Sequence, residues 1–200
     1  MKLVAITGGI ASGKSTILRS LSARLHAPWV SCDQIVDALY AEEEVLMAVR
    51  QRFENAVFPQ GALDRKALGK TVFADEEARH WLEGLLHPLV LQAIQTWREK
   101  ANAERHSAWG FVEVPLLYEV DFPLDRDIDM VVACSRSTQL ERIRRRDHLG
   151  EEQAQGRISA QLPIEHKVIR ADVVVWNDGS EAVLEQLIDL AAEGIEGIRS

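Results

Sequence analysis

Residues 8–16 are the stretch of this sequence whose types and spacing could bind phosphate. They read Gly-Gly-Ile-Ala-Ser-Gly-Lys-Ser-Thr, and Gly8 to Ser15 match the pattern G-x-x-x-x-G-K-[ST]. An apolar run precedes them and apolar residues at helical spacing follow, so the pattern joins an expected strand to an expected helix. There, backbone N–H groups and the positive end of the helix dipole point at one anion. The stretch therefore predicts binding of nucleotide phosphate.

Each residue type in this loop suits that chemistry. Glycine at positions 8 and 13 allows backbone conformations and a close approach to phosphate that a Cβ would obstruct. The Lys14 side chain can reach the β- and γ-phosphates, and the Ser15 hydroxyl can ligate the Mg²⁺ that bridges them. We expect these loop residues to contact the nucleotide: Gly9, Ala11, Ser12, Gly13, Lys14, Ser15 and Thr16.

Two carboxylates stand near the ends of expected strands. Asp33 follows the strand 29–32, and Glu113 lies at the end of the strand 109–114. Ligands of open α/β sheets bind outside the carboxyl ends of the strands, so Asp33 could accept a proton from an attacking hydroxyl. It could equally cap the following helix. Glu113 could lie near Mg²⁺ or on a solvated side of its strand. The residues alone leave both pairs of alternatives open.

An arginine cluster lies on a helix expected from about Thr138. Arginine occupies positions 142, 144, 145 and 146, and Arg142 and Arg146 share one face of the helix. Guanidinium groups match the geometry of phosphate oxygens, and the chain as a whole has a formal net charge of −8. The cluster therefore predicts a mobile cap over the nucleotide.

The elements that would position these residues alternate between strand and helix. Strands are expected at 3–6, 29–32, 109–114, 129–134 and 172–176, which predicts a three-layer α/β/α fold with a parallel sheet of about five strands. We expect a nucleotide-binding core of residues 1–41, 109–137 and 171–200, a helical insert over 42–108, and a lid over 138–170. Within the insert, Pro88 is expected to start the last helix, and His87 to be extended. The residues alone favour a structural role for His87.

Composition excludes several classes of protein. The 200 residues suit one domain, and the 46% hydrophobic and 27% charged content is ordinary for a soluble globular protein. No apolar run approaches the roughly 20 residues of a membrane span, so we expect no membrane contact and a cytoplasmic location. The net charge argues against nucleic-acid binding. Cys32 and Cys134 are expected to be buried free thiols. Composition leaves the oligomeric state open and is compatible with a monomer.

The ordered series of motifs along essentially the whole chain resembles the dephospho-coenzyme A kinase family. The phosphate loop alone is common to very many proteins, whereas the Leu-His-Pro and Val-Pro-Leu-Leu-x-Glu segments are specific. The matching segments are 6–15, 33–36, 63–68, 86–89, 114–119, 139–142, 146–147, 157–161, 171–172 and 177–179.

The resemblance implies Mg²⁺- and ATP-dependent phosphorylation of the ribose 3′-hydroxyl of dephospho-CoA, which gives CoA and ADP in the last step of CoA biosynthesis. It implies catalytic roles for Lys14, Asp33 and Arg142, and favours Asp33 as the base. For ATP it adds Arg142, Arg146 and Asn177 to the loop. For the acceptor it implies contacts from Asp33, Arg65, His87, Leu116, Glu119 and Gln161.

The sequence departs from the family pattern at two places. Ser31-Cys32-Asp33 stands where the family usually shows Asp-Ala-Asp, so the role of a carboxylate pair is weakened. Ala11 stands where glycine is usual. Alanine should be tolerated there if its φ is negative.

Two other functions remain as alternatives. One is a kinase of another small acceptor, such as a nucleoside, nucleotide or sugar, although such a kinase does not require the insert with Arg65 and Leu-His-Pro. The other is a nucleotide-dependent switch. Residues 147–150 match its D-x-x-G pattern, yet they follow an arginine-rich helix rather than a strand, and the sequence has no Asn-Lys-x-Asp motif.

Overall fold

The computed structural model of the protein describes residues 1–59, 61–104 and 107–198; the remaining positions, which fall in the expected insert and core, lie outside the described residues. The chain forms two compact units. The first consists of Met1–Cys32 and Trp97–Ser200, and the second of Asp33–Thr96.

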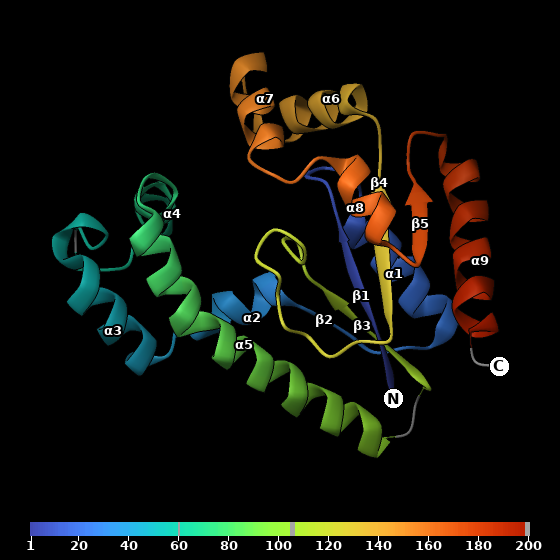
Figure 1. The fold of residues 1–200 in the computed structure, drawn as a ribbon, viewed down its shortest axis with the longest axis horizontal. Helices are drawn as coiled ribbons and strands as arrows, with labels where there is room; N and C mark the ends of the chain where they lie inside the picture. The colour runs from blue at the N-terminus through green and yellow to red at the C-terminus, as the bar shows by residue number, and fades with distance from the viewer. Residues whose placement is uncertain (60, 105–106, 199–200) are drawn as a thin grey trace. The chain divides into compact units, whose positions relative to one another are not determined.

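The first unit is built on a five-stranded sheet in which all pairings are parallel (Figure 1). The strands lie in the order β2 (Trp29–Ser31), β3 (Trp109–Glu113), β1 (Lys2–Gly8), β4 (Ile128–Ala133) and β5 (Val173–Trp176). This confirms the predicted α/β class and sheet. Each strand lies within two residues of its expected position, because strands buried on both faces read as continuous apolar runs.

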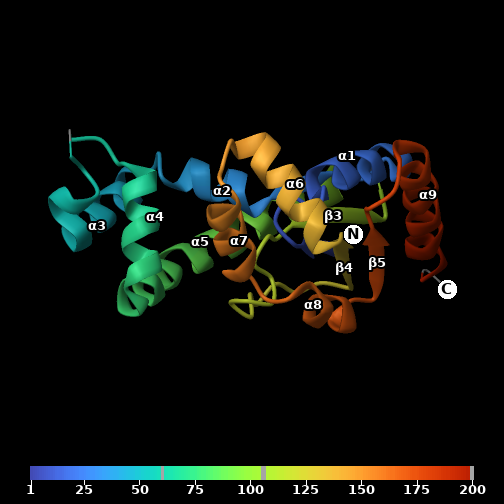
Figure 2. The same cartoon turned by 90° about the horizontal axis from the view of Figure 1, so that it is seen from above.

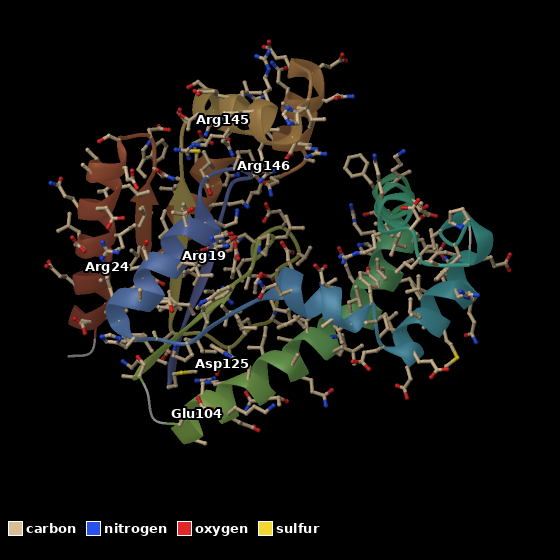
Figure 3. All side chains as sticks on the ribbon, turned by 180° about the vertical axis from the view of Figure 1, so that it is seen from behind. Arg19, Arg24, Glu104, Asp125, Arg145 and Arg146 are labelled. Carbon is tan, nitrogen blue, oxygen red and sulfur yellow. The ribbon has the colours of Figure 1, made fainter. Side chains whose placement is uncertain are left out.

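Helices cover both faces of this sheet. Figure 2 shows α1 (Lys14–Leu25) and α8 (Ile164–Arg170) on opposite sides of it. Helix α9 (Glu181–Gly197) packs beside α1, and the two share one core in which Ile17, Leu21 and Ile188 are fully buried. At the surface, Arg24 of α1 points toward α9 and pairs with Glu185 and Asp189 (Figure 3). These contacts fix the helix that begins at the phosphate loop.

Two further helices of this unit lie beyond the carboxyl ends of the strands. Helix α6 (Arg136–Asp147) follows β4, and its N-cap residue Ser135 accepts a hydrogen bond at Oγ from the backbone N–H of Thr138 at 3.3 Å. Helix α7 (Glu151–Ser159) follows it. Both lie at the end of the sheet toward which the β5 arrow points in Figure 1. The arginine cluster is therefore at the end of the sheet where ligands of such folds bind.

The regular elements of the second unit, within the described residues, are helical. They are most of α2 (Cys32–Leu39), α3 (Glu43–Phe53), the 3₁₀ turn η1 (Glu54–Ala56), α4 (Arg65–Ala74) and the greater part of α5 (Glu76–Glu104). Helix α4 starts at a strong N-cap, since the Asp64 carboxylate accepts hydrogen bonds from the backbone of Lys66 and Ala67. A separate apolar core, which includes Val49 and Leu68, holds these helices together.

The predicted helix start at Pro88 is wrong. Pro88 lies inside α5, and His87 is therefore helical rather than extended. Proline lacks the N–H that would donate to the carbonyl of Gly84, which weakens the helix locally. Apolar side chains on both sides of Pro88 are buried at every fourth position, and their burial outweighs that loss. They are Leu82, Leu86, Val90 and Ile94.

Both cysteines lie in the interior of the protein. Cys32 and Cys134 are free and buried, as predicted, and burial raises the pKa of the Cys134 thiol to about 11. Cys134 is therefore a protonated core residue near neutral pH.

Among the helices that the structure describes, none is both long enough and apolar enough to cross a membrane.

Candidate active site around the phosphate loop

Glycine is required at two positions of the loop between β1 and α1. At Gly8, φ is 147°, and an added Cβ would lie 2.0 Å from the carbonyl oxygen of Val132 on the neighbouring strand. At Gly13, φ is 95°, and an added Cβ would lie 2.4 Å from Nδ2 of Asn177. Gly13 is also the N-cap of α1, and it has no side chain with which to cap the N–H groups of that helix end. The start of α1 therefore suits an anion.

Ala11 does not meet the condition of a negative φ under which alanine would be tolerated without strain. Its φ is 58°, in the left-handed region, where an L-residue is disfavoured by roughly 1–2 kcal/mol. Alanine itself disfavours this conformation, and the next residue, Ser12, is fully buried, so we attribute the conformation to the loop. The usual family glycine would adopt it without strain.

A cavity of about 500 Å³ lies over this loop. It falls within the usual range for small-molecule sites. Figure 3 shows Arg145 and Arg146 on α6, which supplies one wall. The lining residues are Ala11, Ser12, Gly13, Lys14, Ser15, Thr16, Arg142, Arg145 and Arg146. The structure thus brings most of the predicted ATP contacts together in one basic cavity.

Arg142 and Asn177 are both fixed against the loop. The Arg142 guanidinium donates to the carbonyls of Ala11 and Ser12 at 3.4 Å each, and to the carbonyl of Asn177 at 3.1 Å. Asn177 in turn donates from Nδ2 to the carbonyl of Ser12 at 2.8 Å. Two residues far apart in the sequence therefore support the same turn of the loop.

Arg146, in contrast, is held by its neighbour on the helix. Its guanidinium donates twice to the Asp147 carboxylate, at 2.7 and 3.0 Å, and Arg157 donates to the same carboxylate. The hydrogen bond from Arg146 is the main cause that lowers the pKa of Asp147. Because the Arg146 side chain is 58% exposed, this pair is weak, and a phosphate could compete for the guanidinium.

Ser15 and Glu113 form the polar pair beneath the cavity. Ser15 Oγ donates to Glu113 Oε1 at 3.1 Å. Glu113 is only 8% exposed, so the alternative that put it on a solvated side of the strand is wrong. A hydroxyl beside a carboxylate suits Mg²⁺, which takes few protein oxygens when it also binds substrate phosphates. The described residues contain no larger metal-binding cluster of histidine, cysteine or acidic side chains.

Lys14 folds back over its own loop. Its ammonium donates to the carbonyl of Gly8 at 3.3 Å and to that of Gly9 at 2.8 Å. The ammonium of the predicted catalytic lysine is therefore held on backbone carbonyls of its own loop.

Two glutamines hold the backbone of Ile10. Gln161 Oε1 accepts from the N–H of Ile10 at 2.7 Å, and Gln139 Nε2 donates to its carbonyl at 2.9 Å. Gly9 leaves room for this arrangement, since a Cβ there would lie 2.3 Å from Gln139 Nε2. Sequence analysis predicted Gln161 as an acceptor contact and gave Gln139 no role. The only signal for Gln139 was its place in the motif that ends at Arg142.

Glu119 is also engaged within the protein. Its Oε1 accepts from the N–H of Leu162 at 3.1 Å and pairs with the Lys167 ammonium at 2.5 Å. Its Oε2 is buried and finds no hydrogen-bond partner among the described residues. Lys167, which belongs to the expected lid, is fully buried. Leu116, predicted with Glu119 as an acceptor contact, is 42% exposed.

The remaining predicted acceptor residues lie in the second unit. Asp33 is in the first turn of α2, which begins at Cys32, and both roles predicted for it, proton acceptor and helix cap, stay open. Arg65 starts α4, pairs with Asp37 and stacks over the Tyr40 ring, 4.8 Å from its centroid. His87 lies within α5. The roles of these residues stay predictions.

Comparison with known proteins agrees with this geometry. The sequence model of the family "Dephospho-CoA kinase" matches residues 2–182. The dephospho-CoA kinase of Anaeromyxobacter dehalogenans is 41% identical, over 100% of this chain and 94% of the relative. Among solved structures, TT1252 from Thermus thermophilus aligns with a TM-score of 0.79 and 29% identity, over 100% and 98% of the two chains. A dephospho-CoA kinase from Campylobacter jejuni aligns with a TM-score of 0.67 and 28% identity, over 99% and 98%.

Proposed function

Because the chain belongs to the dephospho-CoA kinase family, we propose that it transfers the γ-phosphoryl group of ATP to the ribose 3′-hydroxyl of dephospho-CoA. The products are CoA and ADP, and the reaction is the last step of CoA biosynthesis. The observation that carries the proposal is the basic cavity over the phosphate loop, in a chain whose whole length matches this family.

ATP binds with its phosphates in that cavity. The start of α1 and the Lys14 ammonium neutralise phosphate charge, and Arg142 and Arg146 add two guanidinium groups from α6. Phosphoryl transfer needs positioning and charge neutralisation more than covalent catalysis, and these groups supply both. Asn177 keeps Arg142 beside the loop through its carbonyl.

Mg²⁺ fits the Ser15 and Glu113 pair, because both side chains offer oxygen and the carboxylate is buried beside the hydroxyl. When bound there, the ion would supply positive charge that neutralises the nucleotide phosphates. Of the two residues, Ser15 is the proposed ligand. Glu113 orients the Ser15 hydroxyl by accepting its hydrogen bond.

Acceptor binding is assigned to Asp33, Arg65, His87 and Leu116. Asp33 accepts the proton of the 3′-hydroxyl, as its place directly after the second strand and the family pattern suggest. Residues 42–108 form the acceptor-binding insert, and residues 138–170 the lid. For Glu119 and Gln161, the observed contacts favour a role in the phosphate loop rather than on the acceptor. The proposed enzyme is cytoplasmic and uses only small-molecule substrates.

An acceptor panel tests the function. Purified protein with Mg-ATP is given dephospho-CoA or, separately, nucleosides, nucleotides and sugars, and ADP formation is coupled to mass spectrometry of the product. We expect ADP and CoA to form together with dephospho-CoA. Lys14→Ala is the inactive control, because loss of the phosphate-loop charge should reduce turnover by about 10²-fold or more. Turnover with another acceptor and none with dephospho-CoA would contradict the assignment.

A further inference from the structure

A single carboxylate oxygen fixes both ends of the segment 162–167. Glu119, in the loop after β3, accepts at Oε1 from the N–H of Leu162 at 3.1 Å, and the same oxygen forms an ion pair with the Lys167 ammonium at 2.5 Å. Lys167 lies on α8, which begins directly after Pro163. The segment, at the C-terminal end of the proposed lid, is therefore anchored to the loop that follows β3.

The same segment and the residue before it contact the phosphate loop at two backbone atoms. Gln161 Oε1 accepts from the N–H of Ile10 at 2.7 Å, and the Lys167 ammonium reaches the carbonyl of Gly8 at 3.4 Å, a long hydrogen bond with a charge–dipole attraction. The Gly8 carbonyl also accepts from Lys14 at 3.3 Å. Two lysines thus share one carbonyl of the loop.

Burial distinguishes these two lysines. Lys167 is 0% exposed, whereas Lys14 lines the open cavity. A buried ammonium is strongly disfavoured unless it is paired, and Glu119, whose side chain is 14% exposed, supplies the pairing charge. A buried ion pair is weak evidence for stability, because apolar residues of similar size often stabilise a core as well or better. What apolar residues could not provide is a cation on the Gly8 carbonyl.

We propose that Glu119 and Lys167 are positioning residues of the kinase reaction. They hold the loop backbone from Gly8 to Ile10 in the conformation that receives the phosphates. When Lys14 leaves the Gly8 carbonyl to meet nucleotide phosphate, Lys167 keeps a cation on that carbonyl. The inference rests on the proposed function only in that the loop binds ATP.

The expected consequence is a loss of preorganisation when the pair is removed. The N–H groups of a phosphate loop act on charge most strongly when they already converge on the phosphate position before it binds. Disturbing Gly8 and Ile10 should therefore weaken nucleotide binding and lower kcat, while KM for the acceptor stays close to wild type.

Lys167→Met, Glu119→Gln and the double variant test this, with Lys100→Met as the matched control on an exposed part of α5. Binding of a non-hydrolysable ATP analogue is measured by calorimetry without acceptor, together with thermal unfolding. Lys167→Met leaves Glu119 buried and without its ammonium partner, so Tm should fall. We expect the analogue's Kd to rise by about 10- to 100-fold, the range for loss of a hydrogen bond from a charged donor.

The double variant separates positioning from stability. It removes both charges, while the amide oxygen introduced by Glu119→Gln can still accept from the N–H of Leu162, so Tm should recover toward wild type. Nucleotide affinity should stay low, because the Gly8 carbonyl still lacks its buried cation. Recovery of both Tm and affinity in the double variant would overturn the proposal, as would wild-type affinity in folded Lys167→Met. Since no acceptor is present, failure of the dephospho-CoA assignment would appear separately in the acceptor panel.

Discussion

Ser15 Oγ donates a hydrogen bond to Glu113 Oε1 at 3.1 Å, and this contact joins the start of α1 to the end of β3. Glu113 is buried, although it is a polar residue, and it is the last residue of a core strand. A bond of this kind orients the hydroxyl that would ligate Mg²⁺. Residues that orient metal ligands typically change metal affinity by about 10- to 100-fold when they are replaced.

Glu113→Gln should therefore raise the Mg²⁺ concentration needed for half-maximal turnover by about 10-fold or more. Glutamine keeps the size and an acceptor oxygen but removes the negative charge. The measurement is a Mg²⁺ titration of ADP formation at saturating substrates. Glu193→Gln, on an exposed part of α9, is the control. An unchanged Mg²⁺ dependence in Glu113→Gln would mean that Glu113 only completes the core hydrogen bonding of Ser15.

The left-handed conformation of Ala11 gives a second prediction. Ala11→Gly removes strain of roughly 1–2 kcal/mol but adds flexibility to the unfolded chain, which offsets about 0.4–1 kcal/mol of that gain. We expect a Tm equal to or slightly above wild type, and unchanged affinity for an ATP analogue. Ala11→Val places a β-branched residue at φ 58° and should lower both, since that conformation is a genuine outlier for such residues.

Thermal unfolding and calorimetry of Ala11→Gly and Ala11→Val test whether the loop requires a left-handed conformation at position 11. If valine at position 11 is as stable and binds as well as alanine, the loop does not need a left-handed residue there. The two variants differ from wild type at one position in the same cavity wall, so each serves as the control for the other.

Sequence reasoning was most accurate where a local pattern determines the structure. The phosphate loop follows from glycine, lysine and serine at fixed spacing, and β1 and β4 follow from continuous apolar runs. The position of Pro88 shows the limit of a local rule. Proline normally marks a helix boundary, but apolar side chains on both sides of it are buried, and this packing keeps α5 continuous.

Lys167 could not be placed from sequence for a different reason. A lysine in a polar helix normally predicts solvent exposure, and its burial depends on Glu119, a residue remote in the chain. Gln161 was selected through the family motif, yet its partner proved to be the backbone of Ile10. Residue types identified these side chains as polar contacts, whereas their partners follow only from tertiary packing.

The lid gives a third prediction, which is proteolytic. Arg144, Arg145 and Arg157 are exposed on α6 and α7, whereas Lys167 on α8 is buried. Trypsin should therefore cut the apo protein at these arginines and not at Lys167. With a non-hydrolysable ATP analogue and dephospho-CoA, cutting there should slow as the lid closes. Cutting at Lys100, on α5, is the reference within each digest. Equal cutting rates with and without ligands would indicate a solvated basic helix instead of a lid.

The last prediction concerns Asp33, which lies in the first turn of α2 at the start of the second unit. Asp33→Asn keeps the size and most hydrogen bonding of the side chain but removes its capacity to accept a proton. Loss of the charge near a helix start should change stability by only about 0.3–1 kcal/mol.

If Asp33 accepts the proton of the 3′-hydroxyl, turnover of Asp33→Asn should fall by about 10²- to 10⁴-fold, the usual range for a positioned general base. Affinity for the ATP analogue should stay close to wild type, because the phosphate loop is unchanged. ADP formation with dephospho-CoA, analogue binding and thermal unfolding are measured on one preparation. Asp125→Asn, whose side chain is 95% exposed in the wild-type protein, is the matched control. A variant that loses stability but keeps its turnover per folded molecule would show that Asp33 supports α2, and the proton acceptor would then be sought at another carboxylate, with Glu113 and Glu119 as the next candidates.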